Sequence, residues 1–379
     1  MKLEQIRWQN NKGWEVTKTD LETTDQVQLV LAFGNPDLIA VPERFEELKR
    51  RYPNAHIVGG STAGNVLGTS ITDDDIVATA VYFEKSHIKI TSADIDDPSK
   101  LQETASVLVS KLQSPDLRHV LVLSDGIHFN GSELANGVNV LQGIPVTGGL
   151  VGDNGRFKET FILADGPARP KRIVFVGFYG EHLHTGHGCF AGWGEFGIDR
   201  VITKSKGNVV YEIDGQPALT LYKKYLGEYA AQLPSSGLRF PLSIRSDKND
   251  ITLIRTLLGI NEEEQSLTFA GDVPEGSITL LMKGNIDDLI ASAGEAAKQA
   301  KYSNANGNTG LAVVISCVGR KLLMDQMTDE ELETVQNILG ENTWMTGFYS
   351  YGELSPFNKD FWQCKLHNQT MTLMSLYEG

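Results

Sequence analysis

Three continuous apolar runs predict buried β-strands. They cover residues 27–33, 120–123 and 311–315, and each leads into a short turn of small or polar residues. Runs without a polar residue at every second position are typical of strands that are buried on both faces of a sheet. The chain is therefore expected to contain sheets that are covered on both sides.

Each run belongs to a recurring unit. Where the first run leads to its glycine loop, apolar residues such as Phe45 and Leu48 recur at helical spacing. A second strand ends in the glycines, and a third strand follows at residues 76–83, 173–179 and 371–376, consistent with an antiparallel return. This unit of strand, helix, strand and glycine loop predicts an α/β fold with mixed β-sheets flanked by helices.

The third copy of the unit is displaced along the chain by an insertion. The insertion is predicted to carry a hairpin formed by residues 267–269 and 278–280, and a helix capped by Asn285. Asparagine is a preferred N-cap because its side chain accepts a hydrogen bond from the first helical turn. We expect two packed halves built from the repeated unit, covering residues 25–225 and 226–377.

Composition narrows the class of protein. The 379 residues are 41% hydrophobic and 22% charged, which is ordinary for a globular chain and excludes a disordered one. The net charge of −14 disfavours binding to nucleic acid or to an anionic membrane, since both need a clustered basic face. The three cysteines form no C-x-x-C motif, and neither a signal peptide nor a membrane-spanning apolar stretch is visible. A cytoplasmic protein is expected.

Several ordered motifs resemble those of the FIST sensory family. They are Val58-Gly59-Gly60-Ser61-Thr62-Ala63-Gly64, Gly148-Gly149 with Gly152-Asp153, Gly192-Trp193, Ser316-Cys317-Val318-Gly319-Arg320, Thr346-Gly347-Phe348-Tyr349-Ser350-Tyr351-Gly352-Glu353 and His367-Asn368-Gln369-Thr370-Met371. Together they resemble the FIST N-terminal and FIST C domains over residues 25–377. The family is regarded as a sensory module, and is proposed to bind small molecules such as amino acids. The resemblance implies a ligand-binding sensory protein. The chain is expected to leave no room for an output domain, so it either signals through a separate signalling protein or does something else.

The glycine loops are the first candidate for the ligand site. Ligands of open α/β sheets bind beyond the carboxyl ends of the strands, where glycine lets a ligand approach the backbone. The alternative is that each glycine serves only a tight turn or close strand packing. The candidate ligand-binding residues are Gly59, Gly60, Ser61, Thr62, Gly148, Gly149, Asp153, Asn154, Arg320, Tyr349, Tyr351, Glu353 and Asn368.

An amino-acid ligand would need a partner for each of its two charges. Arg320 could hold the carboxylate through paired donors, and Asp153 or Glu353 could hold the ammonium. Alternatively, Arg320 and Glu353 form a structural ion pair with each other, since buried charges are normally paired. Tyr349 and Tyr351 could offer hydroxyls to a ligand, or they could be ordinary core aromatics.

Two further functions remain as alternatives. His182, His184 and His187 could ligate a metal or haem iron, and some FIST proteins are haem-based nitric-oxide sensors. Alternatively, these histidines are only polar residues at the end of a strand and bind nothing. Cys317 ends a strand as a catalytic nucleophile would, but the glycine pattern of a nucleophile elbow is absent, and a free cysteine is usually a small buried hydrophobe. We therefore expect no cofactor and no catalytic residue, with the haem sensor and the cysteine-dependent enzyme as alternatives.

Overall fold

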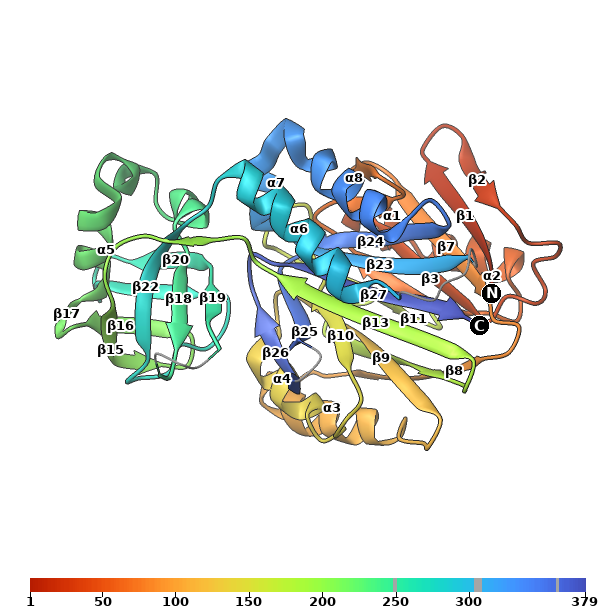
Figure 1. The fold of residues 1–379 in the computed structure, drawn as a ribbon, viewed down its shortest axis with the longest axis horizontal. Coiled ribbons are helices and arrows are strands. Elements are labelled where there is room, and N and C mark those ends of the chain that lie inside the picture. The colour runs from red at the N-terminus through yellow and green to blue at the C-terminus, as the bar shows by residue number, and fades with distance from the viewer. Residues whose placement is uncertain (248–250, 303–308, 359–360) are drawn as a thin grey trace.

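The computed structural model describes residues 1–247, 251–302, 309–358 and 361–379. These residues form an α/β fold with mixed sheets flanked by helices, which confirms the predicted fold class. Figure 1 shows a large body and a smaller lobe, which consists of residues 194–283 and is joined to the body by two neighbouring segments of the chain.

The body contains three sheets of six strands each. The first has the order β11 (Ile162–Ala164), β4 (His56–Ser61), β3 (Leu29–Gly34), β7 (Ile76–Tyr82), β1 (Lys2–Gln9), β2 (Gly13–Thr19). The second has the order β26 (Phe361–His367), β25 (Gly352–Asn358), β10 (Val146–Leu150), β9 (Leu117–Ser124), β12 (Arg172–Tyr179), β8 (His87–Asp94). The third has the order β13 (Leu183–Phe190), β27 (Met371–Glu378), β23 (Gly310–Cys317), β24 (Thr343–Ser350), β5 (Asn65–Leu67), β6 (Ser70–Thr72).

The same strand pairing occurs in all three body sheets. Strands β3, β9 and β23 each lie parallel to the next main strand, β4, β10 and β24 respectively. Each also lies antiparallel to a later strand, β7, β12 or β27. The predicted antiparallel return after each glycine loop is therefore confirmed.

The buried faces of the three sheets meet in one core. Leu31 of β3, Leu121 of β9 and Val313 of β23 belong to a single cluster of fully buried side chains. The rings of Phe33 and Phe348 stack with 4.8 Å between their centroids and join the first sheet to the third. The continuous apolar character of these strands reflects burial on both faces.

Helices cover the outer faces of the sheets (Figure 1). In the body they are α1 (Pro36–Ile39), α2 (Pro42–Arg51), η1 (Pro98–Lys100), α3 (Leu101–Ser110), α4 (Gly131–Val138), α6 (Ile286–Ala300), α7 (Val318–Met324), η4 (Asp325–Met327) and α8 (Thr328–Leu339). The predicted cap of α6 is confirmed, because the Asn285 side chain accepts a hydrogen bond of 2.8 Å from the backbone N–H of Asp288. No helix in the described ranges is both long and apolar enough to span a bilayer.

The lobe is a nine-stranded sheet with one main helix. Its strands are β14 (Gly194–Glu195), β15 (Arg200–Lys206), β16 (Val209–Ile213), β17 (Gln216–Pro217), β18 (Leu242–Arg245), β19 (Leu253–Arg255), β20 (Leu257–Asn261), β21 (Ser266–Phe269) and β22 (Ile278–Lys283), and its helices are α5 (Ala218–Leu226), η2 (Gly227–Gln232) and η3 (Ser235–Arg239). The hairpin predicted from residues 267–269 and 278–280 is wrong. Strand β21 pairs with β16 and with β20, which is nearer to it in sequence than β22. Strand β22 pairs instead with β14, β15 and β18.

Strands also pair between the two predicted halves of the chain. Strands β5, β10 and β13 from the first half pair with β24, β25 and β27 from the second. The position predicted for the boundary, between residues 225 and 226, lies in α5. The body is thus completed by segments from both halves, and the lobe is an insertion between β13 and α6.

Candidate functional site: the junction of body and lobe

The first glycine of each loop allows close contact between parallel strands. A Cβ atom at Gly59 would lie 1.7 Å from the carbonyl oxygen of Ala32, and one at Gly148 or Gly347 would lie 1.8 or 1.9 Å from the carbonyl oxygen of the neighbouring strand. No side chain fits at such distances. These three glycines are therefore required by strand packing.

The structure brings the glycine loops together, and they bond to one another. The backbone N–H of Tyr349 donates to the carbonyl of Gly64, and that of Tyr351 donates to Leu150, each over 2.8–2.9 Å. The hydroxyl of Ser61 donates to the carbonyl of Gly152 over 2.6 Å. The predicted loop residues Gly60, Ser61, Thr62 and Gly149 are all buried in this contact.

Asp153 holds the second loop in shape. Its carboxylate accepts hydrogen bonds from the backbone N–H groups of Phe157, Lys158 and Glu159, and from the hydroxyl of Tyr351. The neighbouring residue Asn154 adopts a positive φ of 60° and is exposed. Asp153, which was predicted to hold an ammonium group, is thus occupied by protein donors.

Arg320 is fully buried, and all five of its N–H donors are used. It forms an ion pair with Glu331, with 2.7 Å between Nη2 and Oε2, and it also donates to Ser292 and to the carbonyls of Leu289 and Ala191. The alternative pairing of Arg320 with Glu353 is therefore wrong.

The other oxygen of Glu331 is also occupied. Glu331 Oε1 accepts hydrogen bonds from the hydroxyls of Ser316 and Tyr349, so Tyr349 belongs to the same buried network as Arg320. With all of its donors used by the protein, Arg320 has none left with which to bind a ligand carboxylate.

Glu353 is buried, and no cation of the described residues is paired with it. Its Oε1 accepts from the hydroxyl of Ser350 over 2.5 Å, and its Oε2 accepts from the N–H and the hydroxyl of Thr370 over 3.1 and 2.9 Å. Within the described ranges no Lys or Arg forms an ion pair with it. Burial raises the pKa of Glu353 to about 7.

A cavity of about 240 Å³ lies next to this network, between the body and the lobe. We call it the junction cavity. The lining side chains from the body are Cys189, Phe190, Phe357, His367 and Thr370; those from the lobe are Thr252, Ile254 and Met282; and Ala191, Gly192 and Trp193 come from one of the two connecting segments. Its wall is mostly apolar, with a few polar groups, which is the usual composition of a small-molecule site.

The polar groups of the junction cavity are oriented by the protein behind them. His367 Nε2 donates to the carbonyl of Ser355 over 3.1 Å, and burial lowers the pKa of His367 to about 4, so the ring is neutral and its Nδ1 is an acceptor. The hydroxyl of Thr370 donates to Glu353, which leaves its oxygen lone pairs as acceptors. Of these two lining residues, His367 therefore carries an acceptor at Nδ1 and Thr370 carries one at Oγ1, which also lies 3.3 Å from Oγ1 of Thr372.

Asn368 supports the cavity wall from behind. Its Nδ2 donates to the carbonyl of His367 over 3.0 Å, and its Oδ1 accepts from the N–H of Thr256 in the lobe over 3.4 Å. The side chain is 1% exposed. Asn368 thus links strand ends of the body and the lobe.

The cavity residues Cys189, Trp193 and His367 are absent from the ligand-binding residues predicted from the sequence, whereas the sequence places Thr370 beside Asn368 as a candidate donor to the ligand cavity. The signal that could have found them is the Gly192-Trp193 pair together with the His367–Thr370 motif, which are distant in sequence but carry the family resemblance. In the structure, the indole N–H of Trp193 donates to the carbonyl of Gln369 over 3.2 Å and brings the two motifs together.

The cysteines and histidines that suggest other chemistry are separated from one another. Burial raises the pKa of Cys317, and raises that of Cys189 to about 12, so both are protonated thiols. His184 stacks on Tyr302, His187 packs edge-on against His119, and His182 is exposed. Among the residues that the structure describes, no three His, Cys, Asp or Glu side chains are grouped as metal ligands.

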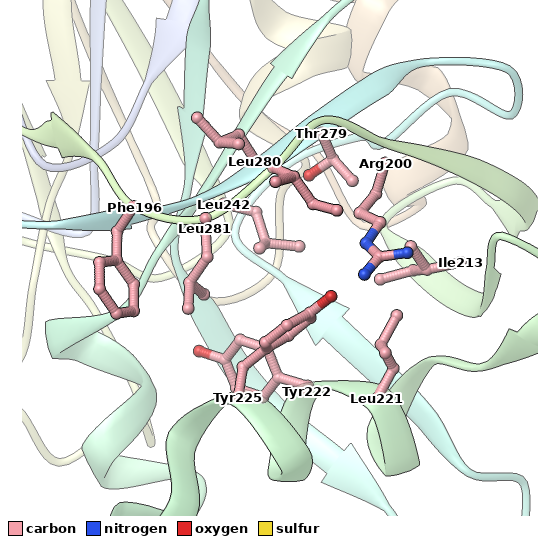
Figure 2. A pocket seen from close by; sticks show the side chains of 12 residues that line it. Phe196, Arg200, Ile213, Leu221, Tyr222, Tyr225, Leu242, Thr279, Leu280 and Leu281 are labelled. Carbon is pink, nitrogen blue, oxygen red and sulfur yellow. The ribbon is translucent and has the colours of Figure 1, made fainter.

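The lobe contains a smaller cavity of its own. Figure 2 shows Tyr222 and Tyr225 of α5 directed towards Leu242 and Leu281 of the lobe sheet. The enclosed volume is about 40 Å³ and its wall is almost entirely apolar. Three of its lining side chains, Phe196, Ile198 and Tyr225, are exposed, so the space lies at the lobe surface, and it is too small for a metabolite.

Comparison with known families assigns residues 28–216 to the FIST N domain and residues 218–356 to the FIST C domain. A relative is an uncharacterized protein of Methanocaldococcus jannaschii, 26% identical over 316 residues that make up 77% of this chain. The chain spans 60% of the length of that relative. A solved structure of cyanuric acid hydrolase from A. caulinodans matches 100% of this chain and 99% of its own, with a TM-score of 0.36 and 8% identity. Because the two family models follow one another and together cover most of the chain, the protein belongs to the FIST family of sensory domains.

Proposed function

We propose that this FIST protein is a sensor that binds a small molecule in the junction cavity. The observation that supports the proposal is the convergence of distant segments on one cavity: Gly192-Trp193, Thr252 with Ile254, and His367 with Thr370. Two of these segments carry the family resemblance. A cavity with an apolar wall and converging polar groups is the default position for a ligand in a protein of this kind.

The lining favours a ligand with an apolar body and a donor group. Trp193, Ile254 and Met282 provide the apolar wall, while His367 and Thr370 provide acceptors. The buried carboxylate of Glu353 lies one hydrogen bond behind Thr370, which favours a positively charged donor through its field. Amines and amino acids with apolar side chains satisfy these conditions, bound with the amino group towards Thr370.

Binding of a ligand between the body and the lobe could change the position of the lobe, and this change could carry the signal. The ligand would contact the body through Cys189 and Thr370 and the lobe through Ile254 and Met282. A ligand that makes contacts to both parts stabilises the arrangement in which those contacts exist, and so shifts the population of lobe orientations. A separate signalling protein would recognise this arrangement. That partner and the cytoplasmic location stay predictions.

Thermal denaturation of the full chain with leucine, methionine and phenylalanine, and with their decarboxylated amines, tests the proposal. A ligand that binds only the folded state adds about 2.7 kcal/mol at a hundredfold excess over its dissociation constant. We expect at least one compound to raise the melting temperature, and Thr370→Val to abolish that rise.

The matched control is Thr346→Val. Thr346 is a fully buried threonine of β24 that does not line the cavity, and its hydroxyl has no hydrogen-bond partner within the described ranges. This variant should respond to ligand as the wild type does. No response from any compound, or an undiminished response in Thr370→Val, would contradict the proposal.

A further inference from the structure

A second cavity lies at the same junction, beside other residues of the same two strands. Its volume is about 490 Å³. Successive strand residues point to opposite faces, and the neighbours in β19 divide accordingly: Ile254 lines the junction cavity, while Leu253 and Arg255 line the second one. Lys365 of β26 and Asn136 of α4 complete this wall. We call it the arginine cavity.

Arg255 is a buried cation that has no carboxylate partner among the described residues. It is 4% exposed, and the acceptors of its hydrogen bonds are the backbone carbonyls of Asp272, Ile254 and Leu366, at 2.9, 3.0 and 3.1 Å. In the described part of the chain, no carboxylate lies at ion-pair distance from it, and Nη2 donates to no protein group. Burial lowers the pKa of Arg255 to about 10, although the charge of Asp272 acts in the opposite direction.

This arrangement differs from that of the other buried arginine. Arg320 has Glu331 as its counter-ion and no free donor, whereas Arg255 keeps its full charge beside a cavity. A buried charge without an opposite charge is unfavourable, and its usual remedy is a partner that brings the missing charge. The orientation of Arg255 is fixed by the three carbonyls before any ligand arrives.

The remaining charged side chains of the cavity make it cationic. Lys365 forms no ion pair with any described residue, while Arg245 is already paired with Asp199 over 2.6 Å. Asp272 is the one carboxylate in the described part of the wall, and its Oδ1 accepts from Asn130 over 2.9 Å. Asn136, Ser277 and Gln363 add neutral polar groups.

We propose that the arginine cavity binds a small organic carboxylate, with Arg255 and Lys365 as its partners. Because Nε and Nη1 of Arg255 donate to the three carbonyls, the N–H groups of Nη2 are the ones that can donate to a carboxylate. The second cation, Lys365, would neutralise a second carboxylate of a dicarboxylic acid. Its volume lies in the range of about 300–1,000 Å³ that is usual for small-molecule sites. The site is separate from the junction cavity and does not depend on the ligand proposed there.

Calorimetric titration of the full chain with acetate, succinate and inorganic phosphate tests this site. Succinate is expected to bind more tightly than acetate, because it carries a second carboxylate for Lys365, and more tightly than phosphate. Lys365→Gln should weaken succinate binding about tenfold, the loss of one charge-assisted contact. Arg255→Lys, which keeps the charge but loses the Nη2 donors and the paired contacts that orient them, should weaken it further.

The control variants separate this site from folding and from the junction cavity. Lys298→Gln removes an exposed cation that is paired with Glu295 on α6 and should leave succinate binding unchanged. Thr370→Val should also bind succinate normally, whatever its response to amines. Absence of succinate binding, tighter binding of phosphate, or binding that survives both Lys365→Gln and Arg255→Lys would overturn the proposal. Lys365→Gln keeps the test valid if Arg255→Lys does not fold, because the Lys365 side chain donates to no described protein group.

Discussion

The carboxylate of Glu353 accepts two hydrogen bonds from Thr370, one from its backbone N–H and one from its hydroxyl over 2.9 Å. Thr370 lines the junction cavity, and Glu353 is fully buried behind it. The ionisation of a buried glutamate is thereby connected to the orientation of a hydroxyl in the candidate binding site.

The first prediction is that Glu353 makes the protein less stable as the pH rises. Its pKa is raised from 4.5 in the unfolded chain to about 7 in the folded protein. The stabilising contribution of the protonated form is fully present below pH 4.5 and is lost as the pH rises through about 7. The shift corresponds to about 3 kcal/mol. Urea denaturation of wild type and Glu353→Gln across this range should show a smaller loss of stability in the variant.

Wild type and Glu353→Gln must be compared with each other, because other groups in the protein also titrate between pH 4.5 and 7. In Glu353→Gln the new amide can still accept from Thr370 and donate to the Ser350 hydroxyl, so the fold is expected to be retained. Parallel stability profiles for the two proteins would show that Glu353 keeps an ordinary pKa.

The second prediction concerns the buried pair of Arg320 and Glu331. Removing the cation in Arg320→Ala leaves a buried carboxylate and several carbonyls without donors, which should cost about 3–5 kcal/mol. The double variant Arg320→Met with Glu331→Met should recover part of this loss, since it leaves no unpaired charge. Equilibrium unfolding in urea measures the free energy of unfolding of the single and the double variant. A single variant as stable as the wild type would contradict the assignment of Arg320 as a structural residue.

The third prediction is that Gly148 tolerates no side chain. A Cβ would lie 1.8 Å from the carbonyl oxygen of Val122, so Gly148→Ala must separate β10 from β9 at a cost of about 3 kcal/mol or more. Gly166→Ala is the matched control, because its Cβ would meet no atom closer than 4.0 Å. It should change stability by less than about 1 kcal/mol. Equal melting temperatures for the two variants would be inconsistent with the observed strand contact.

The fourth prediction is that the native cysteines react slowly with thiol reagents. Cys189, Cys317 and Cys364 are all buried, and burial raises the pKa of each thiol, so little thiolate is present at neutral pH. A cysteine introduced at the exposed position Ser99 should react much faster in the same protein. Fast labelling of Cys317 in the folded state would instead support the cysteine-dependent enzyme.

The sequence predicts the strands well because a strand that is buried on both faces appears as a continuous run of apolar residues. The run at 311–315 lies inside β23, and the strand predicted at 173–179 coincides with β12 but for Arg172. The hairpin of β1 and β2 at the amino terminus is not predicted, since its residues alternate with charged ones and its partner β7 is distant in sequence. Pairing partners depend on the whole chain, so a local pattern cannot identify them.

Site residues are harder to predict for the same reason. The ends of strands and the glycine loops are visible in the sequence, but whether a polar side chain there is free or occupied depends on distant groups. Arg320 is occupied by Glu331 of α8, and Asp153 is occupied by its own loop and Tyr351. Arg255 lies in a short strand that has no long apolar run. The sequence around it therefore does not indicate that its side chain is buried, or that no described carboxylate is paired with it.

The lobe leaves the body and returns to it at one place, since Gly194 and Lys283 are paired across β14 and β22. An insertion whose two ends lie side by side in this way can be replaced as one unit. The connection between β13 and α6 of the body can be kept when the inserted segment changes, provided that the two ends of the insertion stay as close as paired strands. Lobes of different size or specificity can therefore be exchanged at this position, and a reporter domain inserted at a surface turn of the lobe would move with it.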